Sequence, residues 1–316
     1  MKVNGFLNSI AIFGLTAMTG VSAAQSGKSD GGSIAGTWYN SYCSQVELTA
    51  GPGNLVQGTY TSHTGSAGSY RITGYIGVAA KDPQKTNGTP VALSMYWRAI
   101  NVDASKADGS WHWVSNFGGQ LHPAQTVSVP GQKPYTVEET LEIMNMIVAT
   151  ATFPGFNKQA PIMWPETIQF HKTPPNYCEP ITPTPAIPYK SEASDLVTGT
   201  WQNSAGDILR LTADIADGTV SGLFNKASGE AFNVKGLVDN FSNFVPGVMV
   251  KEQGVSLSLY QTNGAANGLM TMAGGVSPSN RASMNLFTNN LSSTDWNSRF
   301  VESTVDKISF RRIGSQ

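Results

Sequence analysis

The side chains best suited to chemistry in this sequence are neutral hydrogen-bonding groups at alternate positions of two short segments. Asn40 and Ser44 lie four residues apart, and Tyr60, Ser62 and Thr64 alternate further along the chain. Because side chains of a strand point to one face at every second position, each set should share a face. Such uncharged donors and acceptors suit a polar, uncharged ligand. Trapped water that satisfies the same groups is the alternative.

Residues 36–44, with the sequence G-T-W-Y-N-S-Y-C-S, set the pattern for the rest of the chain. Aromatic residues and threonine favour a strand. Alternation then places Trp38, Asn40 and Tyr42 on the same face as Ser44. The phrase returns as G-T-W-Q-N at residues 199–203, which predicts two copies of one domain.

Short alternating segments separated by Gly, Pro and Asn clusters run through both halves and predict strands. In the first half we expect strands at 36–42, 45–50, 56–63, 70–77, 91–100, 110–117, 140–153 (with a helix as the alternative) and 161–172, and a long loop at 118–136. In the second half we expect them at 199–203, 208–213, 219–225, 231–238, 248–262, 268–276, 282–289 and 305–312. Eight strands that close up-and-down leave no exposed edge and enclose room for one small ligand. The predicted fold is all-β, with two tandem eight-stranded antiparallel up-and-down β-barrels joined by a Pro-rich linker.

Composition predicts where the parts of the chain begin and end. Residues 1–24 combine Lys2, an apolar stretch and a small-residue cleavage site, which indicates a signal peptide and a secreted or periplasmic protein. The apolar stretch is too short for a membrane span, so we expect no membrane partner. The first barrel is expected at 25–175, the Pro-rich linker at 176–195 and the second barrel at 196–316.

Cys43 and Cys178, the only cysteines, are candidates for one disulfide in an exported protein, with two unpaired thiols as the alternative. Cys43 lies in the first predicted hairpin, and Cys178 follows the last strand of the first barrel. The first and last strands of a closed barrel are neighbours, so the two cysteines can meet.

Charge and motifs exclude several classes of protein. With 20 basic and 21 acidic residues, the chain offers no electrostatic basis for binding nucleic acid or anionic lipid. It contains no nucleophile elbow, phosphate-binding loop or metalloprotease motif. The four histidines lack metal-ligand spacing, and we expect His112 and His171 to be solvated. We therefore expect no catalysis, no metal site and no cofactor.

The first half resembles the avidin and streptavidin family. The resemblance is carried by G-T-W-Y-N at 36–40, L-T-A-G at 48–51 and G-T-Y-T-S at 58–62, which follow the family without a gap. It implies biotin as the ligand. Asn40, Ser44 and Tyr60 would donate to the ureido carbonyl, and Ser62 would accept from one ureido N–H.

The same resemblance implies the rest of the pocket. Thr64 matches a wall position, Ser66 lies near the carboxylate tail, and Tyr42 shares the face of the polar cluster. Glu166 is the best match for the acceptor of the second ureido N–H, although it is one methylene longer than the family's Asp or Asn.

Tryptophans would supply the aromatic walls. Trp97 and Trp113 match two wall positions, and Trp111 replaces a hydroxyl that contacts biotin. Trp111 and Trp113 are expected on one face, with His112 on the other. The family's further tryptophan on the seventh strand is missing, because that strand reads I-M-N-M-I-V at 143–148.

The second barrel departs further from the family. Trp201 and Asn203 remain, but Phe224 replaces the tyrosine, and Asp207 and Lys226 replace the two serines. Tyr260 is the best match for the tryptophan wall. We expect Asp207 and Lys226 to form an ion pair that fills a degenerate site.

Trp296 corresponds to the tryptophan that tetrameric avidins lend to a neighbouring pocket, whereas G-F-N stands at the same place (155–157) in the first barrel. Lid donation implies that two barrels meet through their pocket-side faces, either within one chain or across a homodimer that forms a pseudo-tetramer of barrels. Packing of Trp296 on its own loop is the alternative. The expected function is an exported biotin-binding protein. A calycin-type carrier of another small apolar ligand and a structural or adhesive double barrel without ligand are the alternatives.

Overall fold

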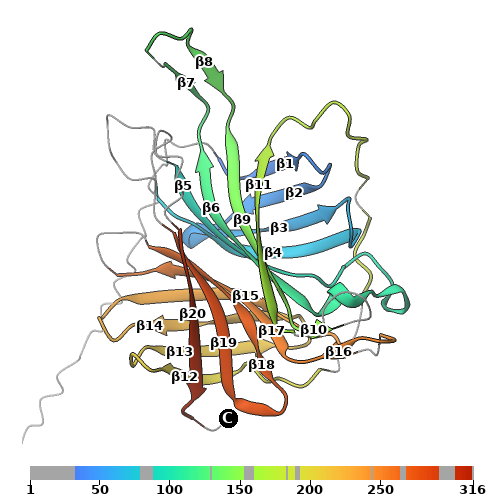
Figure 1. The fold of residues 1–316 in the computed structure, drawn as a ribbon, viewed down its shortest axis with the longest axis vertical. Helices are drawn as coiled ribbons and strands as arrows, with labels where there is room; N and C mark the ends of the chain where they lie inside the picture. Colours follow the sequence, from blue (N-terminus) through green and yellow to red (C-terminus); the bar gives the residue numbers. More distant parts are fainter. Residues whose placement is uncertain are drawn as a thin grey trace, which may run out of the picture.

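The computed structural model describes residues 33–78, 88–128, 130–152, 160–182, 184–188, 193–242, 245–263, 268–291 and 303–314. Within them the chain forms two closed eight-stranded antiparallel barrels, as predicted. Figure 1 shows the barrel of the first half (barrel 1, blue to green) above that of the second half (barrel 2, yellow to red).

Barrel 1 closes where its first and last strands pair, with Asn40 opposite Phe170. Its strands are β1 (Gly36–Asn40), β2 (Gln45–Ala50), β3 (Leu55–Ser62), β4 (Gly68–Ile76), β5 (Thr89–Tyr96), β6 (Trp113–His122), β9 (Thr140–Ala149) and β11 (Ile162–His171). Three short 3-10 helices lie in its connections: η1 (Pro52–Asn54), η2 (Ala104–Lys106) and η3 (Gly109–His112). The predicted strand at 140–153 is thus confirmed over most of its length.

The prediction of a long loop at 118–136 was wrong. β6 continues to His122 and stays paired with β9 as far as Thr140, because Phe117 and Leu121 keep alternating into the barrel core. Beyond it, β7 (Gln125–Val127) pairs with β8 (Tyr135–Val137). These two strands form a hairpin that projects from barrel 1, at the top of Figure 1.

Barrel 2 contains the eight strands expected in the second half. They are β12 (Gly199–Asn203), β13 (Ile208–Asp214), β14 (Thr219–Asn225), β15 (Ala231–Val238), β17 (Gln253–Gln261), β18 (Leu269–Ser277), β19 (Asn280–Leu291) and β20 (Ser303–Arg312). The predicted strand at 248–262 is divided, and its first part, β16 (Met249–Val250), pairs with β10 (Ala151–Thr152) of the first half.

The repeated phrase builds the same local structure in both barrels. Trp38 and Trp201 are completely buried, and each indole Nε1 donates to the carbonyl four residues earlier, at 2.8 and 2.9 Å. In each barrel, a cationic side chain at or just past the end of the last strand lies over the tryptophan ring. Lys172 Nζ lies 4.8 Å from the Trp38 ring centroid, and Arg312 Cζ lies 4.2 Å from that of Trp201.

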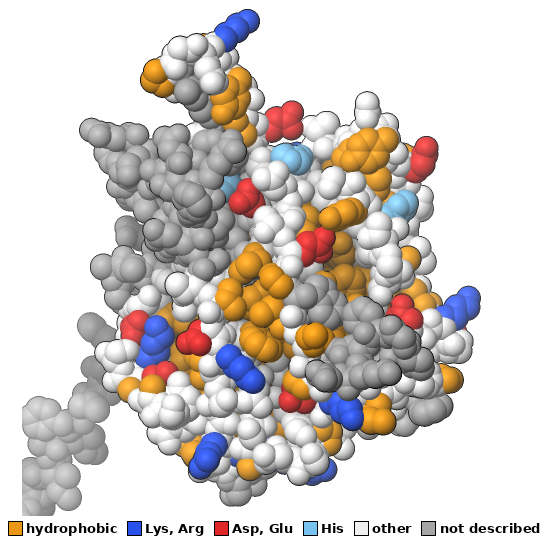
Figure 2. Space-filling view, viewed as in Figure 1, with side chains coloured by type: hydrophobic (Ala, Val, Ile, Leu, Met, Phe, Trp, Pro, Cys, Tyr) orange, Lys and Arg blue, Asp and Glu red, His pale blue; other side chains and the backbone are white. Residues whose placement is uncertain are grey.

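The two barrels pack together through the outer faces of β4, β5 and β6 on one side and β15, β17 and β18 on the other. Ser94 Oγ lies 2.8 Å from Ser258 Oγ, and Ser256 Oγ donates to the Ser115 carbonyl at 2.6 Å. Figure 2 shows apolar side chains gathered across the middle of the face in view, where the barrels meet. Both faces of these sheets are therefore buried, which a two-residue alternation alone does not reveal.

This packing corrects two expectations. His112, expected to be solvated, is 2% exposed, and its Nδ1 lies 2.8 Å from Asp239 Oδ2 of barrel 2. Trp111, expected beside Trp113, packs on Phe241 with ring centroids 4.7 Å apart. The physical reason is η3, since a 3-10 turn breaks the two-residue period on which the prediction rested.

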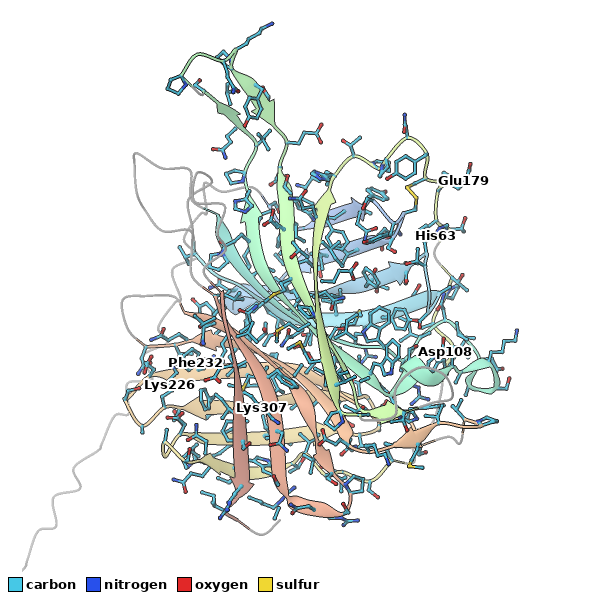
Figure 3. All side chains as sticks on the ribbon, viewed as in Figure 1. His63, Asp108, Glu179, Lys226, Phe232 and Lys307 are labelled. Carbon is cyan, nitrogen blue, oxygen red and sulfur yellow. A yellow bond between two sulfur atoms is a disulfide. The ribbon has the colours of Figure 1, made fainter. Side chains whose placement is uncertain are left out.

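The predicted disulfide is confirmed, with Cys43 and Cys178 Cα atoms 5.3 Å apart. It appears as a yellow bond in Figure 3 and ties the segment after β11 to the β1–β2 hairpin. Tyr177 adds a hydrogen bond from its hydroxyl to the Ser41 carbonyl at 3.0 Å. The linker therefore begins its course held against barrel 1.

Residues 1–32, including the predicted signal peptide, lie outside the described part of the chain, so that prediction stays untested. Nowhere in the described ranges does a helix reach the length and hydropathy that crossing a membrane requires.

Candidate ligand site

A cavity of about 660 Å³ opens at the end of barrel 1 where β1 and β3 finish and β6 begins. Its lining includes eight of the residues predicted from the sequence: Tyr42, Tyr60, Ser62, Thr64, Ser66, Trp97, Trp113 and Glu166. Asn145, Ile147 and Ile168 are further lining residues. The cavity thus joins apolar walls to a small number of polar groups, as small-molecule sites usually do.

The aromatic wall is held in place by its own contacts. Trp97 Nε1 donates to Ser115 Oγ at 2.8 Å. Its ring packs against Tyr70 and Tyr60, with centroids 5.1 and 6.1 Å away. Because the polar atom of the indole is already paired, Trp97 offers a ligand its apolar ring.

The turn after β1 lies behind the polar end of the cavity: Tyr42 of this turn is a lining residue, whereas the predicted Asn40 and Ser44 are not. Asn40 Oδ1 accepts hydrogen bonds from the backbone N–H groups of Tyr42 and Ser44, at 3.0 and 2.9 Å. Asn40 Nδ2 is buried, and no hydrogen-bond partner for it lies in the described part of the chain. Ser44 Oγ accepts from the His63 N–H at 3.0 Å, which leaves its own hydroxyl proton to donate.

Tyr60 lies between this turn and the cavity. Burial raises the pKa of Tyr60, while the polar groups of Ser44, Ser62 and Asn40 act in the opposite direction. The phenol is therefore protonated at neutral pH and can donate. Ser62 Oγ donates to the Thr64 carbonyl at 2.8 Å, so its lone pairs remain able to accept.

Glu166 and Tyr42 mark the mouth of the cavity. Tyr42 is 47% exposed, and Glu166, as its hydrogen-bond partner and as a negative charge, raises the pKa of Tyr42. The Glu166 carboxylate is thus engaged with a residue at the edge of the site.

Asn145 on β9 is a lining residue that sequence reasoning missed. It is 3% exposed, and its Oδ1 has no hydrogen-bond partner within the described ranges. It lies directly opposite Glu166 in the β9–β11 ladder. The available signal was a single amide among the inward positions of β9, which are otherwise apolar.

The corresponding turn in barrel 2 is closed on itself. Asn203 Oδ1 accepts from the N–H groups of Ala205 and Asp207, as Asn40 does from the equivalent groups in barrel 1. Asp207 Oδ1 accepts from the Ala227 N–H at 2.9 Å, in the role of Ser44. The second carboxylate oxygen of Asp207 then takes the hydrogen bond from Asn203 Nδ2, at 2.7 Å.

The expected ion pair between Asp207 and Lys226 is not formed. Lys226 Nζ pairs instead with Glu230 at 3.0 Å and lies 5.4 Å from the centroid of Phe232, beside it in Figure 3. Glu230 lies four residues after Lys226, in the hairpin between β14 and β15, and its carboxylate is within reach of the lysine. Asp207 is already occupied by Asn203.

Aromatic rings occupy the barrel 2 interior. Phe224, which replaces the tyrosine, packs on Phe232 and Phe310 with centroids 5.8 and 6.3 Å away. Tyr260, expected as a wall, faces barrel 1 and stacks near Tyr75 at 5.6 Å. It belongs to the outward set of β17 residues, opposite to the buried leucines of that strand.

Trp296 and residues 155–157 lie outside the described residues, so lid donation stays a prediction. A search of the described ranges found no group of three side chains able to hold a metal ion. No protein-family model matches the chain, and no curated protein matches it significantly.

Proposed function

We propose that this protein binds biotin, or a close ureido analogue, in the barrel 1 cavity, with barrel 2 as a structural partner. The observation that carries the proposal is the polar corner of this cavity, where Tyr60 and Ser62 line the wall and the buried Asn40 and Ser44 lie behind Tyr60. Asn40 Nδ2 makes no hydrogen bond of good geometry to any described residue, and leaving a buried polar group unpaired costs about 1–3 kcal/mol. A ligand carbonyl that reached Asn40, Ser44 and Tyr60 would recover that cost.

The cavity walls support the same ligand. Trp97 and Trp113 would cover an apolar ring, and Ser62 would accept from one ureido N–H. At about 660 Å³ the cavity falls within the range usual for small-molecule sites. The resemblance at residues 36–62 supplies the choice of biotin among ureido compounds.

A carrier of another small apolar ligand is the second candidate. It is favoured by Ile147 and Ile168, which give the β9–β11 side of the cavity an aliphatic wall. Such a ligand would leave Asn40 Nδ2 unpaired, whereas biotin would not. A purely structural role fits the filled interior of barrel 2 better than the open one of barrel 1.

Binding to immobilised biotin, competed by free biotin, tests the proposal directly, and calorimetry gives the affinity. Tyr60→Phe should weaken binding by about 0.5–1.5 kcal/mol, the usual net value of one hydrogen bond. Tyr75→Phe, on the outer face of barrel 1, is the matched control and should change nothing.

A wild-type chain that gives no heat and no competition rejects the function. Unchanged affinity in Tyr60→Phe rejects the role of Tyr60 alone. We further propose export through residues 1–24 and pairing of two chains into an assembly of four barrels; chromatography with light scattering of the processed protein tests the latter.

A further inference from the structure

We propose that Asn145, and not Glu166, accepts the hydrogen bond from the second ureido N–H of the ligand. The inference rests on the proposed function and deepens it, because it names the group that reads the ligand on the β9–β11 side of the cavity.

The position of Asn145 in the sheet turns its side chain inward. Its neighbours at every second position, Ile143 and Ile147, belong to the barrel 1 core, and Ile147 also lines the cavity. On the adjoining strands Asn145 stands opposite Glu166 and Phe117. Residues at alternate positions share a face, so the amide lies on the cavity wall.

One polar atom of the Asn145 side chain lacks a hydrogen-bond partner. Its Oδ1 is buried and makes no hydrogen bond to any residue that the structure describes. A buried polar group normally has a partner, so an unpaired one calls for an explanation such as a ligand. The unpaired atom is the oxygen, which accepts; a rotated amide would place the donor Nδ2 there, and that group would not pair with a ligand N–H.

Glu166 is less suited to the role. It is only partly buried, and it is the hydrogen-bond partner of Tyr42 at the exposed mouth. Turning its carboxylate inward would forfeit that contact and would strip water from a charge, which is costly without a charged partner. The neutral amide of Asn145 matches a neutral N–H without this penalty.

Paired substitutions in the full-length protein distinguish the two acceptors. Asn145→Leu keeps the size of the side chain and removes its polar atoms; Glu166→Met does the same at the neighbouring position. We expect Asn145→Leu to weaken biotin binding about tenfold, the equivalent of one buried hydrogen bond. Glu166→Met should weaken it less than about threefold by the same measure.

Asn116→Leu is the matched control, because Asn116 is another buried asparagine with an unpaired amide but stands at an outward position of β6. It should leave the affinity unchanged. A purely structural role for Asn145 would lower the melting temperature of the ligand-free protein. We expect the reverse, since Asn145→Leu removes an unpaired polar group while the rise in melting temperature on adding biotin shrinks.

Two cyclic carbamate analogues of biotin, each with one ureido N–H replaced by oxygen, give a second measurement. One isomer should bind the wild type about tenfold more weakly than biotin and show little further loss in Asn145→Leu. Asn145→Ala replaces Asn145→Leu if the latter does not fold.

Three results would overturn the inference. Equal biotin affinity in Asn145→Leu and wild type would do so, as would a loss confined to Glu166→Met. Failure of the wild type to bind biotin at all would reject the proposed function, and this inference with it.

Discussion

Barrel 1 and barrel 2 share a frame and differ at a few inward positions. Both bury the same tryptophan, cover it with a cation and fold the same asparagine turn. In barrel 1 the turn ends in Ser44, and the asparagine keeps a free donor; in barrel 2 it ends in Asp207, which takes that donor. The difference teaches that the residues that build the frame are separate from those that leave barrel 1 with a cavity and an unpaired donor.

The difference also affects the stability of the two barrels. Barrel 2 pairs the amide of its asparagine turn and fills the space around Phe224 with other phenylalanines, so this end of barrel 2 gains the benefit of burial. Barrel 1 leaves Asn40 Nδ2 and Asn145 Oδ1 unpaired beside a cavity. A site prepared for a ligand is less stable than a filled one until the ligand arrives.

The largest expected effect is on the interior of barrel 2. Phe224→Ala should lower the free energy of unfolding by about 3–5 kcal/mol, because it removes a buried ring that contacts two others. Urea unfolding measures this, and Tyr60→Phe at the equivalent position of barrel 1 should shift the curve by less than about 1 kcal/mol. Similar losses at both positions would mean that the two interiors play the same role.

A smaller effect comes from making barrel 1 resemble barrel 2. Ser44→Asp should give Asn40 Nδ2 a carboxylate partner and weaken biotin binding by about 1–3 kcal/mol, measured by calorimetry. Asp207→Ser is the reciprocal change, and it should leave one biotin per chain because Phe224 still occupies barrel 2. If Ser44→Asp binds biotin as tightly as the wild type, the unpaired Asn40 Nδ2 is not the feature that distinguishes barrel 1 from barrel 2.

The smallest effect concerns an unpaired group of barrel 2 at the junction with barrel 1. Burial raises the pKa of Glu252, with Lys307 acting weakly against it, and its Oε2 has no partner within the described part. Between the ordinary pKa and the raised one, the folded state binds more protons than the unfolded state, so the stabilising contribution is present at low pH and is lost as pH rises through the raised pKa. Glu252→Gln mimics the protonated form.

We expect Glu252→Gln to melt a few degrees higher than wild type at neutral pH. The two proteins should converge at about pH 4, where the wild-type side chain is itself protonated. Thermal unfolding followed by circular dichroism at both values measures the difference. A gap of the same size at both pH values would assign the effect to packing.

Much of the fold could be predicted because its causes are local. Period-two alternation and the repeated G-T-W phrase identified both barrels, and closure of the first onto its last strand brought Cys43 to Cys178. The placement of Tyr60 and Ser62 on one inward face was also predictable, since alternate side chains of a strand point to the same side of the sheet.

The rest depends on contacts between distant parts of the chain. Trp111 and His112 were misplaced because η3 breaks the alternation and because their partners, Phe241 and Asp239, belong to the other barrel. Asn145 was missed as a candidate site residue because what singles it out is an unpaired buried atom, and only the surrounding structure reveals that. The closing of the barrel 2 turn by Asp207 depends on a hydrogen bond between two side chains, and composition does not specify such geometry.

The bridge between Cys43 and Cys178 also decides how the molecule responds to a mechanical load. The two cysteines are separated by 135 positions in the chain, and β2 to β11 all lie between them. A pull on the two ends of the chain passes through the sulfur atoms and bypasses that whole segment. Only β1 can be peeled away on that side, whereas the strands of barrel 2 carry the tension directly. Under force, the segment of barrel 1 between the two cysteines therefore carries no tension, and barrel 2 is the part that extends.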